Sequence, residues 1–519
     1  SWATALAARG VLSDKLQLDE AAITWGLYTA ERVRGSIDIQ HLPWPAKEYG
    51  HQDIGAQWLR FVEQGVLGDE PGLGKTRQAL MALEAPALVI STNSMKFKWA
   101  AEIRRWRPDL VPVLIDGSAA KRTKLIESIP SNGIGIINWQ ALRTLSRLSP
   151  YGSIALSDKE KTPGPLNRPW ETVVTDEAHY MKDPKSKQTR AAWAILATSR
   201  RRYGLTATIS PEGPADLWGV MHGIAPEEYP SRTQFIDRYV VCSVSFWGGL
   251  ETYGLRKDTK DEFLGFFDYR YLRRTKKEAL PFLPDKTYTT RYVELPVTQR
   301  KAYNDLEKKY MAIVEGGILA TPGALPQHTR LIQAASATPT LGDGGEVGLT
   351  GPSCKIDALL DLLAEGDDPI VVFSPSRRLI ELASVALTRE GIIHGLITGN
   401  RTLDERQKDV DLFQSGALRA ILCTTKAGGE GLDMTRASRL VFLNRPERAV
   451  ESVQAEDRVH RIGQDKPVEI IDIVAWDTVE HLVHERLGVK GDLAQEIQRD
   501  PNYVVRLIEN RPKSVGRSR

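Results

Sequence analysis

Residues 68–76 read GDEPGLGKT, and this run determines how the surrounding chain can fold. A glycine-rich run that ends in Lys-Thr is typical of the loop between a buried strand and a helix, where free backbone N–H groups face an anion. Gly72 and Gly74 let the backbone approach a phosphate closely. Lys75 would then reach the β and γ phosphates of a nucleotide, and Thr76 would offer its hydroxyl to Mg²⁺.

The run departs from the strict phosphate-loop pattern at one position. That pattern has a glycine five places before Gly74, and this chain has Asp69 there. An ordinary glycine-rich turn before a helix therefore stays open as an alternative. The choice between the two interpretations depends on what the rest of the chain supplies.

Short apolar runs alternate with helical stretches on both sides of this loop. Four runs between residues 48 and 210, and four more between 369 and 444, are typical of buried parallel strands joined by helices. The sequence therefore predicts an α/β fold of two doubly wound parallel-sheet lobes, with helical insertions between them. The predicted strands are 87–92, 134–139, 171–177, 203–208, 369–375, 392–399, 417–425 and 438–444.

Shifts in composition divide the chain into five parts. Aromatic and helical patterns replace the alternation after the first lobe, and glycine and proline cluster at 316–352, which indicates an irregular segment. The predicted parts are an N-terminal extension of unknown role (1–47), lobe one with a helical insertion at about 211–270 (48–275), a linker and helical insertion (276–352), lobe two (353–490), and a brace helix with a basic tail (491–519).

The composition is that of an ordinary globular protein. Of 519 residues, 41% are hydrophobic and 26% are charged, which excludes a disordered or fibrous chain. The 69 Lys and Arg residues nearly balance the 66 Asp and Glu residues, and the formal net charge is +3. This balance excludes a polybasic protein but leaves room for a local basic groove.

Cysteine usage and hydropathy indicate a reducing compartment. Cys242, Cys354 and Cys423 form no CxxC pair, so the sequence supports neither a disulfide framework nor a cysteine-rich zinc site. No apolar run approaches the roughly 20 residues that cross a bilayer. The chain opens at Ser1 without a basic-then-apolar leader. We therefore expect a cytoplasmic protein that contacts no membrane.

A second candidate segment, TVVTDEAHY at 172–180, ends an apolar run in two adjacent carboxylates. Asp176 would hold Mg²⁺ through water, and Glu177 would position and activate the water that attacks the γ-phosphate. Taken alone, such a pair is usually part of a solvated loop. About 100 residues after a phosphate loop, the catalytic interpretation becomes the stronger one.

A third segment, QAEDRVHRIGQ at 454–464, carries Arg458 and Arg461 three residues apart. On a helix this spacing would place both side chains on one face. A bidentate arginine directed at the γ-phosphate would stabilise the charge of the transferring group. The alternative is an ordinary charged surface helix.

With these three segments in place, the chain resembles the Swi/Snf-type ATPases of helicase superfamily two. The likeness runs from about residue 48 to 485, and the resemblance implies two RecA-like lobes. Motif III has Ala207 where many relatives have glycine. The tryptophan that usually precedes Asn-Pro in this family is absent, and Asn444-Arg445-Pro446 stands there instead. The matching segments are YGHQ at 49–52, DEPGLGKT at 69–76, ALVISTNSMKFKWAAEIRRW at 87–106, IINWQAL at 136–142, DEAH at 176–179, LTATI at 205–209, IVVFSPSRR at 370–378, LITGNRTLDER at 396–406, CTTKAGGEGLDM at 423–434 and LNRPERAVESVQAEDRVHRIGQ at 443–464.

The resemblance assigns further site residues. Gln52 would contact the adenine, and Gly431 would belong to the nucleotide site. The aspartate at position 69 is the family's own form of the loop, so Asp69 joins the nucleotide-binding set. ATP and Mg²⁺ are the implied cofactors. The implied DNA contacts are Thr92, Lys98, Trp139, Thr206, Ser374, Thr425 and Lys426.

The segment at 271–303 distinguishes between related activities. Its Arg-Arg-x-Lys, Leu-Pro-x-Lys and Gln-x-x-x-Tyr pattern resembles the linker of Swi/Snf ATPases, which ordinary helicases lack. The resemblance implies a DNA-dependent ATPase that moves along double-stranded DNA, with forked or branched DNA as further candidates. A strand-separating or annealing helicase, and a DNA clamp that uses ATP as a switch, are the rival interpretations. The lack of chromatin-reading modules favours a bacterial or viral source, with a nuclear location if the source is eukaryotic.

Some residues have two readings from sequence alone. Trp99 and Trp139 lie in DNA-side motifs, but a duplex translocase keeps its bases paired, so we expect both mainly to pack. His179 would either couple nucleotide state to lobe two or be satisfied within its own loop. The basic cluster at 273–277 is expected to gate the cleft or hold DNA, and the tail at 511–519 to be a frayed end.

Overall fold

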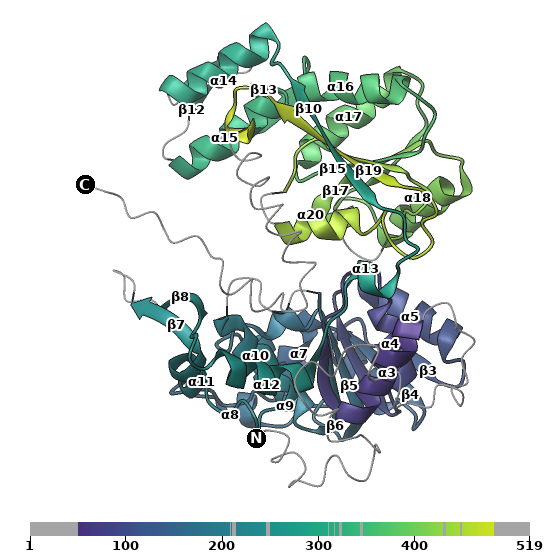
Figure 1. Ribbon diagram of the computed structural model, residues 1–519, viewed down its shortest axis with the longest axis vertical. Coiled ribbons are helices and arrows are strands. Elements are labelled where there is room, and N and C mark those ends of the chain that lie inside the picture. The colour runs from purple at the N-terminus through teal and green to yellow at the C-terminus, as the bar shows by residue number, and fades with distance from the viewer. Residues whose placement is uncertain are drawn as a thin grey trace. The chain divides into compact units, whose positions relative to one another are not determined.

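The computed structural model describes two compact units, which divide between Pro281 and Phe282 (Figure 1). The extension predicted at 1–47 and the brace helix predicted at 491–519 lie outside the described residues. No helix within the described part has the length and apolarity needed to cross a bilayer. The described residues are 50–207, 209, 214–244, 250–309, 311–315, 317–320, 324–342, 346–428, 432–446 and 449–481.

Unit 1 is built on a seven-stranded sheet with the strand order β3-β4-β2-β5-β6-β1-β9, and its neighbouring strands pair in parallel. The four strands predicted for this half are confirmed as β2, β4, β5 and β6. The other three, β1, β3 and β9, were not predicted. The strands are β1 (Gln64–Leu67), β2 (Ala87–Ser91), β3 (Val111–Leu114), β4 (Gly133–Asn138), β5 (Trp170–Asp176), β6 (Ser199–Leu205) and β9 (Tyr271–Leu272).

Helices cover both faces of this sheet, because successive strand residues point to opposite sides. Leu88 and Ile90 join the cluster formed with α7, α9 and α10, whereas Ala87 and Val89 join the cluster formed with α3, α4 and α5. The helices of unit 1 are α3 (Gly50–Val62), α4 (Lys75–Ala82), α5 (Met95–Trp106), α6 (Ala119–Glu127), η4 (Trp139–Ala141), α7 (Leu142–Leu145), α8 (Asp158–Lys161), η5 (Ala178–Met181), α9 (Lys187–Leu196), α10 (Ala215–Ile224), α11 (Arg232–Tyr239), α12 (Lys260–Arg270) and α13 (Lys276–Ala279).

The insertion predicted as helical at about 211–270 contains α10, α11 and α12, and also an antiparallel hairpin of β7 (Val240–Val244) and β8 (Leu250–Leu255). The hairpin was not expected. Its first strand, VVCSV, continues directly from α11 and is rich in β-branched residues, which favour extended backbone.

Unit 2 is built on a six-stranded parallel sheet with the order β10-β19-β18-β15-β17-β16. The four strands predicted here are confirmed as β15 to β18. Residues 286–293, which the predicted boundaries placed in the linker, form the edge strand β10. The strands are β10 (Lys286–Val293), β15 (Ile370–Ser374), β16 (His394–Ile397), β17 (Ala420–Thr424), β18 (Arg439–Phe442) and β19 (Val468–Ala475).

The stretch expected to be irregular at 316–352 is more regular than its glycine and proline content suggested. Its described residues contribute to two antiparallel hairpins and a helix, and the hairpins pack Ala312, Leu319 and Val347 into a small core. The remaining elements of unit 2 are β11 (Met311–Val314), β12 (Gly317–Ala320), β13 (Thr338–Leu341), β14 (Val347–Thr350), α14 (Val297–Lys309), α15 (Ala324–Ser336), α16 (Cys354–Ala364), α17 (Arg377–Arg389), α18 (Leu403–Ser415), α19 (Thr425–Gly428) and α20 (Ala449–Glu456).

Candidate nucleotide site

The strand register of unit 1 brings its candidate motifs to one edge of the sheet. Leu67 at the end of β1 pairs with Leu205 of β6 and with Leu272 of β9, and Asp176 at the end of β5 also pairs with Leu205. The loops that follow these four parallel strands therefore begin side by side. The carboxyl edge of a parallel sheet is where such folds bind ligands.

The phosphate loop connects β1 to α4 and depends on its glycines. Gly72 and Gly74 have φ angles of 88° and 79°, which L side chains rarely adopt. A Cβ on Gly74 would also lie 2.3 Å from Nε2 of Gln52. Lys75 begins α4, and its Nζ donates hydrogen bonds to the carbonyls of Asp69 at 2.6 Å and Glu70 at 3.3 Å.

Asp69 is fully buried and faces Arg274, which lies directly after β9. Arg274 Nη2 lies 2.6 Å from Asp69 Oδ2, and Nε lies 3.0 Å from Oδ1. Gln78 donates to the same carboxylate at 3.0 Å. Burial alone would raise the pKa of Asp69, but Arg274 and Gln78 hold it below its ordinary value. These contacts support a structural role for Asp69 in shaping the loop, and its place in the nucleotide-binding set stays a prediction.

The basic cluster at 273–277 is anchored to the phosphate loop. The Arg273 side chain is 7% exposed and lies 3.7 Å from Glu70, and the backbone N–H of Lys276 donates to the same carboxylate at 2.7 Å. Thr275 and Glu278 form a reciprocal capping box that starts α13. Arg273 and Arg274 are therefore largely buried within unit 1, and the expectation that the cluster gates the cleft or holds DNA stays a prediction.

Gln52 and His51, on α3, pack on the same loop. Gln52 donates from Nε2 to the carbonyl of Leu73 at 3.3 Å and accepts a 2.6 Å bond from Arg77. His51 Nε2 lies 3.0 Å from that carbonyl. Burial and the nearby Arg274 charge lower the pKa of His51 to about 4, so its ring is neutral at neutral pH.

Asp176 and Glu177 form the carboxylate pair at the end of β5. Burial and the adjacent Glu177 charge raise the pKa of Asp176 to about 6, while the indole of Trp99 and the nearby Lys75 ammonium oppose this shift. Glu177 has a φ of 56°, a left-handed conformation that is uncommon in residues other than glycine and is often found at functional sites.

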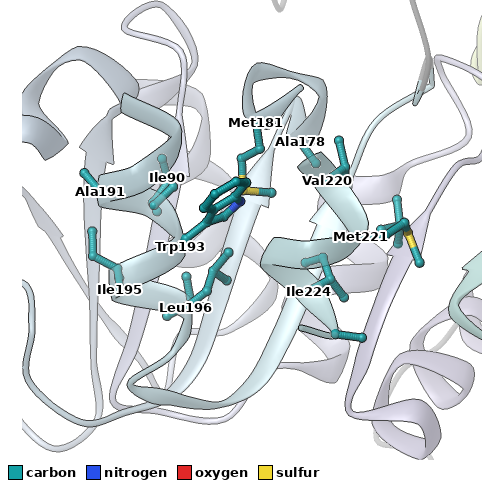
Figure 2. Packing of buried hydrophobic residues seen from close by; sticks show 14 of the residues in the cluster. Ile90, Ala178, Met181, Ala191, Trp193, Ile195, Leu196, Val220, Met221 and Ile224 are labelled. Atoms are coloured by element: carbon teal, nitrogen blue, oxygen red, sulfur yellow. The ribbon is translucent and has the colours of Figure 1, made fainter. Parts of the chain in front are cut away.

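Tight packing fixes the loop that carries this pair. Figure 2 shows Ala178 and Met181 of η5 among side chains of α9 and α10, with Trp193 close to Met181. A Cβ on Gly219 of α10 would lie 2.4 Å from the carbonyl of Met181, so the helix and the loop are in close contact. Such packing holds the backbone of η5, the short helix that directly follows the pair, in place.

His179 connects two motifs of unit 1. Its Nδ1 lies 3.1 Å from the hydroxyl of Thr206, which follows β6, and 3.2 Å from Glu177 Oε2. The ring also stacks on Tyr180. The histidine is therefore satisfied within its loop and also joins the segment after β5 to the segment after β6. These contacts support the reading in which His179 is satisfied within unit 1, and its coupling of nucleotide state to lobe two stays a prediction.

The oxygen donors near the phosphate loop fit a hard divalent cation such as Mg²⁺. Thr76 offers a hydroxyl in the first turn of α4, and Asp176 offers a carboxylate. Among the described residues, no group of three or more His, Cys, Asp or Glu side chains could hold a metal ion. A site with one carboxylate is what Mg²⁺ uses when nucleotide phosphates and water complete its octahedron.

In unit 2, Arg458 and Arg461 follow α20, and the expectation that they share one helical face is wrong. The helix ends at Glu456, and both arginines lie in the turns beyond it. Beyond the helix, Val459 and His460 are buried, and His460 Nε2 lies 2.6 Å from the carbonyl of Pro284. Arg461 forms an ion pair with Asp433.

A buried charge network holds α20 to the edge strand β10. Lys286 Nζ lies 3.1 Å from Glu456 Oε2, the Tyr288 hydroxyl donates to the same oxygen at 2.9 Å, and Arg445 binds Oε1 at 3.0 Å. Arg445 also binds Asp472 at 2.9 Å. The segment that follows the basic cluster is thus attached to the helix that leads to the two arginines.

Two family models match this chain. Residues 51–333 match the SNF2-related domain, and residues 354–463 match the helicase conserved C-terminal domain. The first match alone covers more than half of the 519 residues. The chain belongs to the SNF2-related family.

Individual relatives of this SNF2-related chain are distant. It is 26% identical to the ISWI chromatin-remodeling complex ATPase ISW1 of Saccharomyces cerevisiae, over 92% of this chain and 43% of that protein. It is also 26% identical to an uncharacterized ATP-dependent helicase of Mycoplasma genitalium, over 87% of this chain and 42% of that protein. The chain spans about two fifths of the length of these relatives. The Sulfolobus solfataricus SWI2/SNF2 ATPase core in complex with double-stranded DNA is 22% identical, with a TM-score of 0.40, over 91% of this chain and all of that one.

The residues that the SNF2 resemblance assigns to DNA contact separate into two groups. Trp139, Thr206 and Ser374 are 0% exposed and Thr425 is 4% exposed, so burial argues against direct DNA contact by these four side chains. Each of the first three has a hydrogen-bond partner inside its own unit: the Asp176 carbonyl, His179 and Asn444. Thr92 and Lys98 are partly exposed, Lys426 is exposed, and Gly431 lies outside the described residues.

Sequence reasoning missed two polar roles in this SNF2-related site. Trp99 donates an indole hydrogen bond to the Asp176 carboxylate at 2.8 Å. Arg77 holds Gln52 in place. The aspartate in the phosphate loop could have signalled a partner such as Arg274, since a buried carboxylate requires one. No comparable signal marked Trp99 as more than a core residue.

Proposed function

We propose that this chain is an ATP-driven motor that binds duplex DNA and moves along it, and so a DNA-dependent ATPase. The observation that carries the proposal is that Lys75, which follows β1, and Asp176 and Glu177, at the end of β5, lie at the same carboxyl edge of the unit 1 sheet, where only β6 separates the two strands. Membership of the SNF2-related family supports the same activity. Relatives are named as chromatin-remodeling ATPases and as ATP-dependent helicases.

The residues of unit 1 would divide the chemistry among them. The N–H groups of the phosphate loop and Lys75 would bind the ATP phosphates, with Gly72 and Gly74 allowing close approach. Thr76 and Asp176 would hold Mg²⁺, which neutralises charge on the β and γ phosphates when bound. Glu177 would orient the attacking water and accept its proton. Gln52, held by Arg77, would reach the adenine.

Two arginines of unit 2 would supply the remaining charge. Arg461 pairs with Asp433, whose side chain is 46% exposed, and exposed ion pairs contribute little free energy. Arg461 could therefore exchange this partner for a phosphate at small cost. We propose that Arg458 and Arg461 bind the γ-phosphate in the transition state and that each ATP cycle changes how the units engage DNA.

The DNA contacts would fall on the exposed members of the assigned set: Thr92, Lys98 and Lys426. Contacts with phosphates make binding sensitive to salt and largely independent of sequence. A motor on DNA works where the DNA is, so we place the protein in the cytoplasm if its source is bacterial or viral, and in the nucleus if its source is eukaryotic.

The test compares ATP turnover with duplex DNA, single-stranded DNA, forked DNA and RNA. We expect duplex or forked DNA to stimulate turnover most strongly. Displacement of the third strand of a triplex, without separation of a tailed duplex, would support translocation. Separation of the tailed duplex would instead favour a strand-separating or fork-remodelling helicase. Turnover that no nucleic acid changes would overturn the proposal.

A further inference from the structure

Two tryptophans from separate elements hydrogen-bond to the same residue of the candidate site. Trp99, on α5, donates from Nε1 to Asp176 Oδ2 at 2.8 Å. Trp139, on η4, donates from Nε1 to the backbone carbonyl of Asp176 at 3.0 Å. Both side chains are 0% exposed. One indole therefore holds the carboxylate, and the other holds the backbone that carries it.

The Trp99 bond differs from the usual way in which a buried indole is satisfied. Trp170, at the opposite end of β5, donates to the carbonyl of Leu166 at 3.0 Å, an acceptor with no proposed part in chemistry. Trp99 instead uses the carboxylate that we assign to Mg²⁺. A donor on one carboxylate oxygen fixes the orientation of the other, and outer partners of this kind tune metal affinity. Mg²⁺ is sensitive to such orientation because it requires near-octahedral geometry.

The helix that carries Trp99 also presents residues to solvent. α5 begins just after Thr92, whose hydroxyl lies 3.1 Å from that of Ser94, and Lys98 on its first turns is partly exposed. Lys96 fixes the helix through a 3.1 Å ion pair with Asp116. Thr92 and Lys98 are among the proposed DNA contacts. On α5, the proposed DNA contact Lys98 thus directly precedes Trp99, which donates to the Asp176 carboxylate.

We infer that Trp99 is a positioning residue through which DNA contact on α5 sets the orientation of the Asp176 carboxylate and thereby the affinity for Mg²⁺. The inference rests on the proposed function, because it assigns Asp176 to the metal and α5 to DNA. The Trp99 indole joins α5 to the carboxylate directly, so a small displacement of the helix acts on it. Coupling between two binding sites is reciprocal, so duplex DNA and the metal strengthen each other's binding.

The experiment measures Mn²⁺ binding by electron paramagnetic resonance on the full chain, with AMP-PNP, in the presence and absence of duplex DNA. Trp99→Phe keeps an aromatic ring and removes the N–H donor. We expect it to weaken Mn²⁺ binding about 10-fold, the lower end for a lost outer partner, and to abolish the effect of DNA on that affinity. Trp170→Phe is the matched control, since it removes an equivalent indole bond at the other end of β5, and it should bind Mn²⁺ as the wild type does.

A second pair of variants distinguishes failure of the inference from misfolding and from failure of the proposed function. Benzothienylalanine at position 99 replaces the indole N–H by sulfur at nearly the same volume, and it should match Trp99→Phe. Lys98→Ala should weaken DNA binding and leave Mn²⁺ affinity without DNA unchanged. Equal Mn²⁺ affinity in the wild type and both position-99 variants would overturn the inference. A wild type whose turnover does not respond to DNA would instead refute the proposed function and the coupling, while the Mn²⁺ comparison without DNA would still report on the Trp99 bond.

Discussion

Asp69 and Arg274 form a buried two-point ion pair that joins the phosphate loop to the segment leading out of unit 1. Arg274 Nη2 lies 2.6 Å from Asp69 Oδ2, and the Arg274 backbone N–H also donates to this carboxylate, at 3.0 Å. Twelve residues later in the chain, Lys286 binds Glu456 on α20 of unit 2. The connecting segment is therefore anchored at one end to the phosphate loop and at the other to the helix that precedes Arg458 and Arg461.

Removing one partner of the Asp69–Arg274 pair should be costly, because it leaves a buried charge without compensation. We expect Asp69→Asn and Arg274→Met each to lower the local free energy of unfolding by about 3–5 kcal/mol. The double variant should lose less than the sum, since neither charge remains. Hydrogen exchange of the α3 and α4 amides measures these energies. Strictly additive losses would show that the two side chains do not interact.

The neutral state of buried His51 predicts a loss of stability in mild acid. Its pKa is about 4 in the folded chain, against 6.5 for a histidine exposed to water, so below pH 6.5 the unfolded chain binds the proton more readily. The contribution is complete above pH 6.5 and is lost as the pH falls towards 4. Linkage gives a loss of about 2 kcal/mol at pH 5. His51→Gln should not show this part of the pH dependence in urea unfolding, and a variant with the wild-type profile would contradict the assignment.

The strands were predictable and the long-range polar contacts were not. Runs such as ALVIST and PIVVFSP are apolar on both faces, which is the pattern of central parallel strands. These two runs form β2 and β15. β1, with four residues, gave no periodic signal.

In the candidate site, too, the locally encoded residues were predictable and the long-range contacts were not. The local pattern found Lys75 and the carboxylates, because the glycines and strand ends that position them are adjacent in sequence. Arg274 lies 205 residues from Asp69, and Trp99 lies 77 residues from Asp176. Which side chains meet across such distances depends on strand order, which the sequence does not state. The helix predicted to carry both arginines ends at Glu456, and the local charge pattern gave no sign of this end.

Lys75→Ala should abolish ATP hydrolysis and leave DNA binding largely intact. The ammonium bonds to phosphate-loop carbonyls and would bind nucleotide phosphates, and it has no assigned DNA contact. Turnover with duplex DNA and DNA affinity by fluorescence anisotropy measure the two effects. Lys121→Ala, at an exposed position on α6 of the same unit, is the control and should keep both. Substantial DNA-stimulated turnover by Lys75→Ala would remove the phosphate-loop assignment.

Glu177→Gln should bind Mg·ATP and hydrolyse it very slowly, because an amide cannot accept the proton from water. Nucleotide affinity should change little, since Lys75, Thr76 and Asp176 remain. Single-turnover hydrolysis and equilibrium binding of a fluorescent ATP analogue separate the two quantities. Turnover within a few fold of the wild type would assign the base to another residue.

Arg461→Ala should lower DNA-stimulated turnover by something on the order of 10³, the scale of a lost arginine finger. Arg458→Ala should be severely impaired as well. Nucleotide affinity should change far less, because the guanidinium acts mainly in the transition state. Arg461→Lys should not restore turnover, since lysine lacks the planar fork. Arg291→Ala, which removes a surface ion pair with Glu365 in the same unit, is the control and should behave as the wild type.

The duplex-DNA-stimulated ATP turnover of Arg461→Ala, compared with the wild type and Arg291→Ala, tests the two-unit motor most directly. Arg461 lies hundreds of residues from the phosphate loop and in the other unit, so its effect on hydrolysis requires both units to act on one nucleotide. We expect strong stimulation by duplex DNA in the wild type and in Arg291→Ala, and almost none in Arg461→Ala. Near-normal stimulated turnover in Arg461→Ala would contradict a two-unit ATP motor.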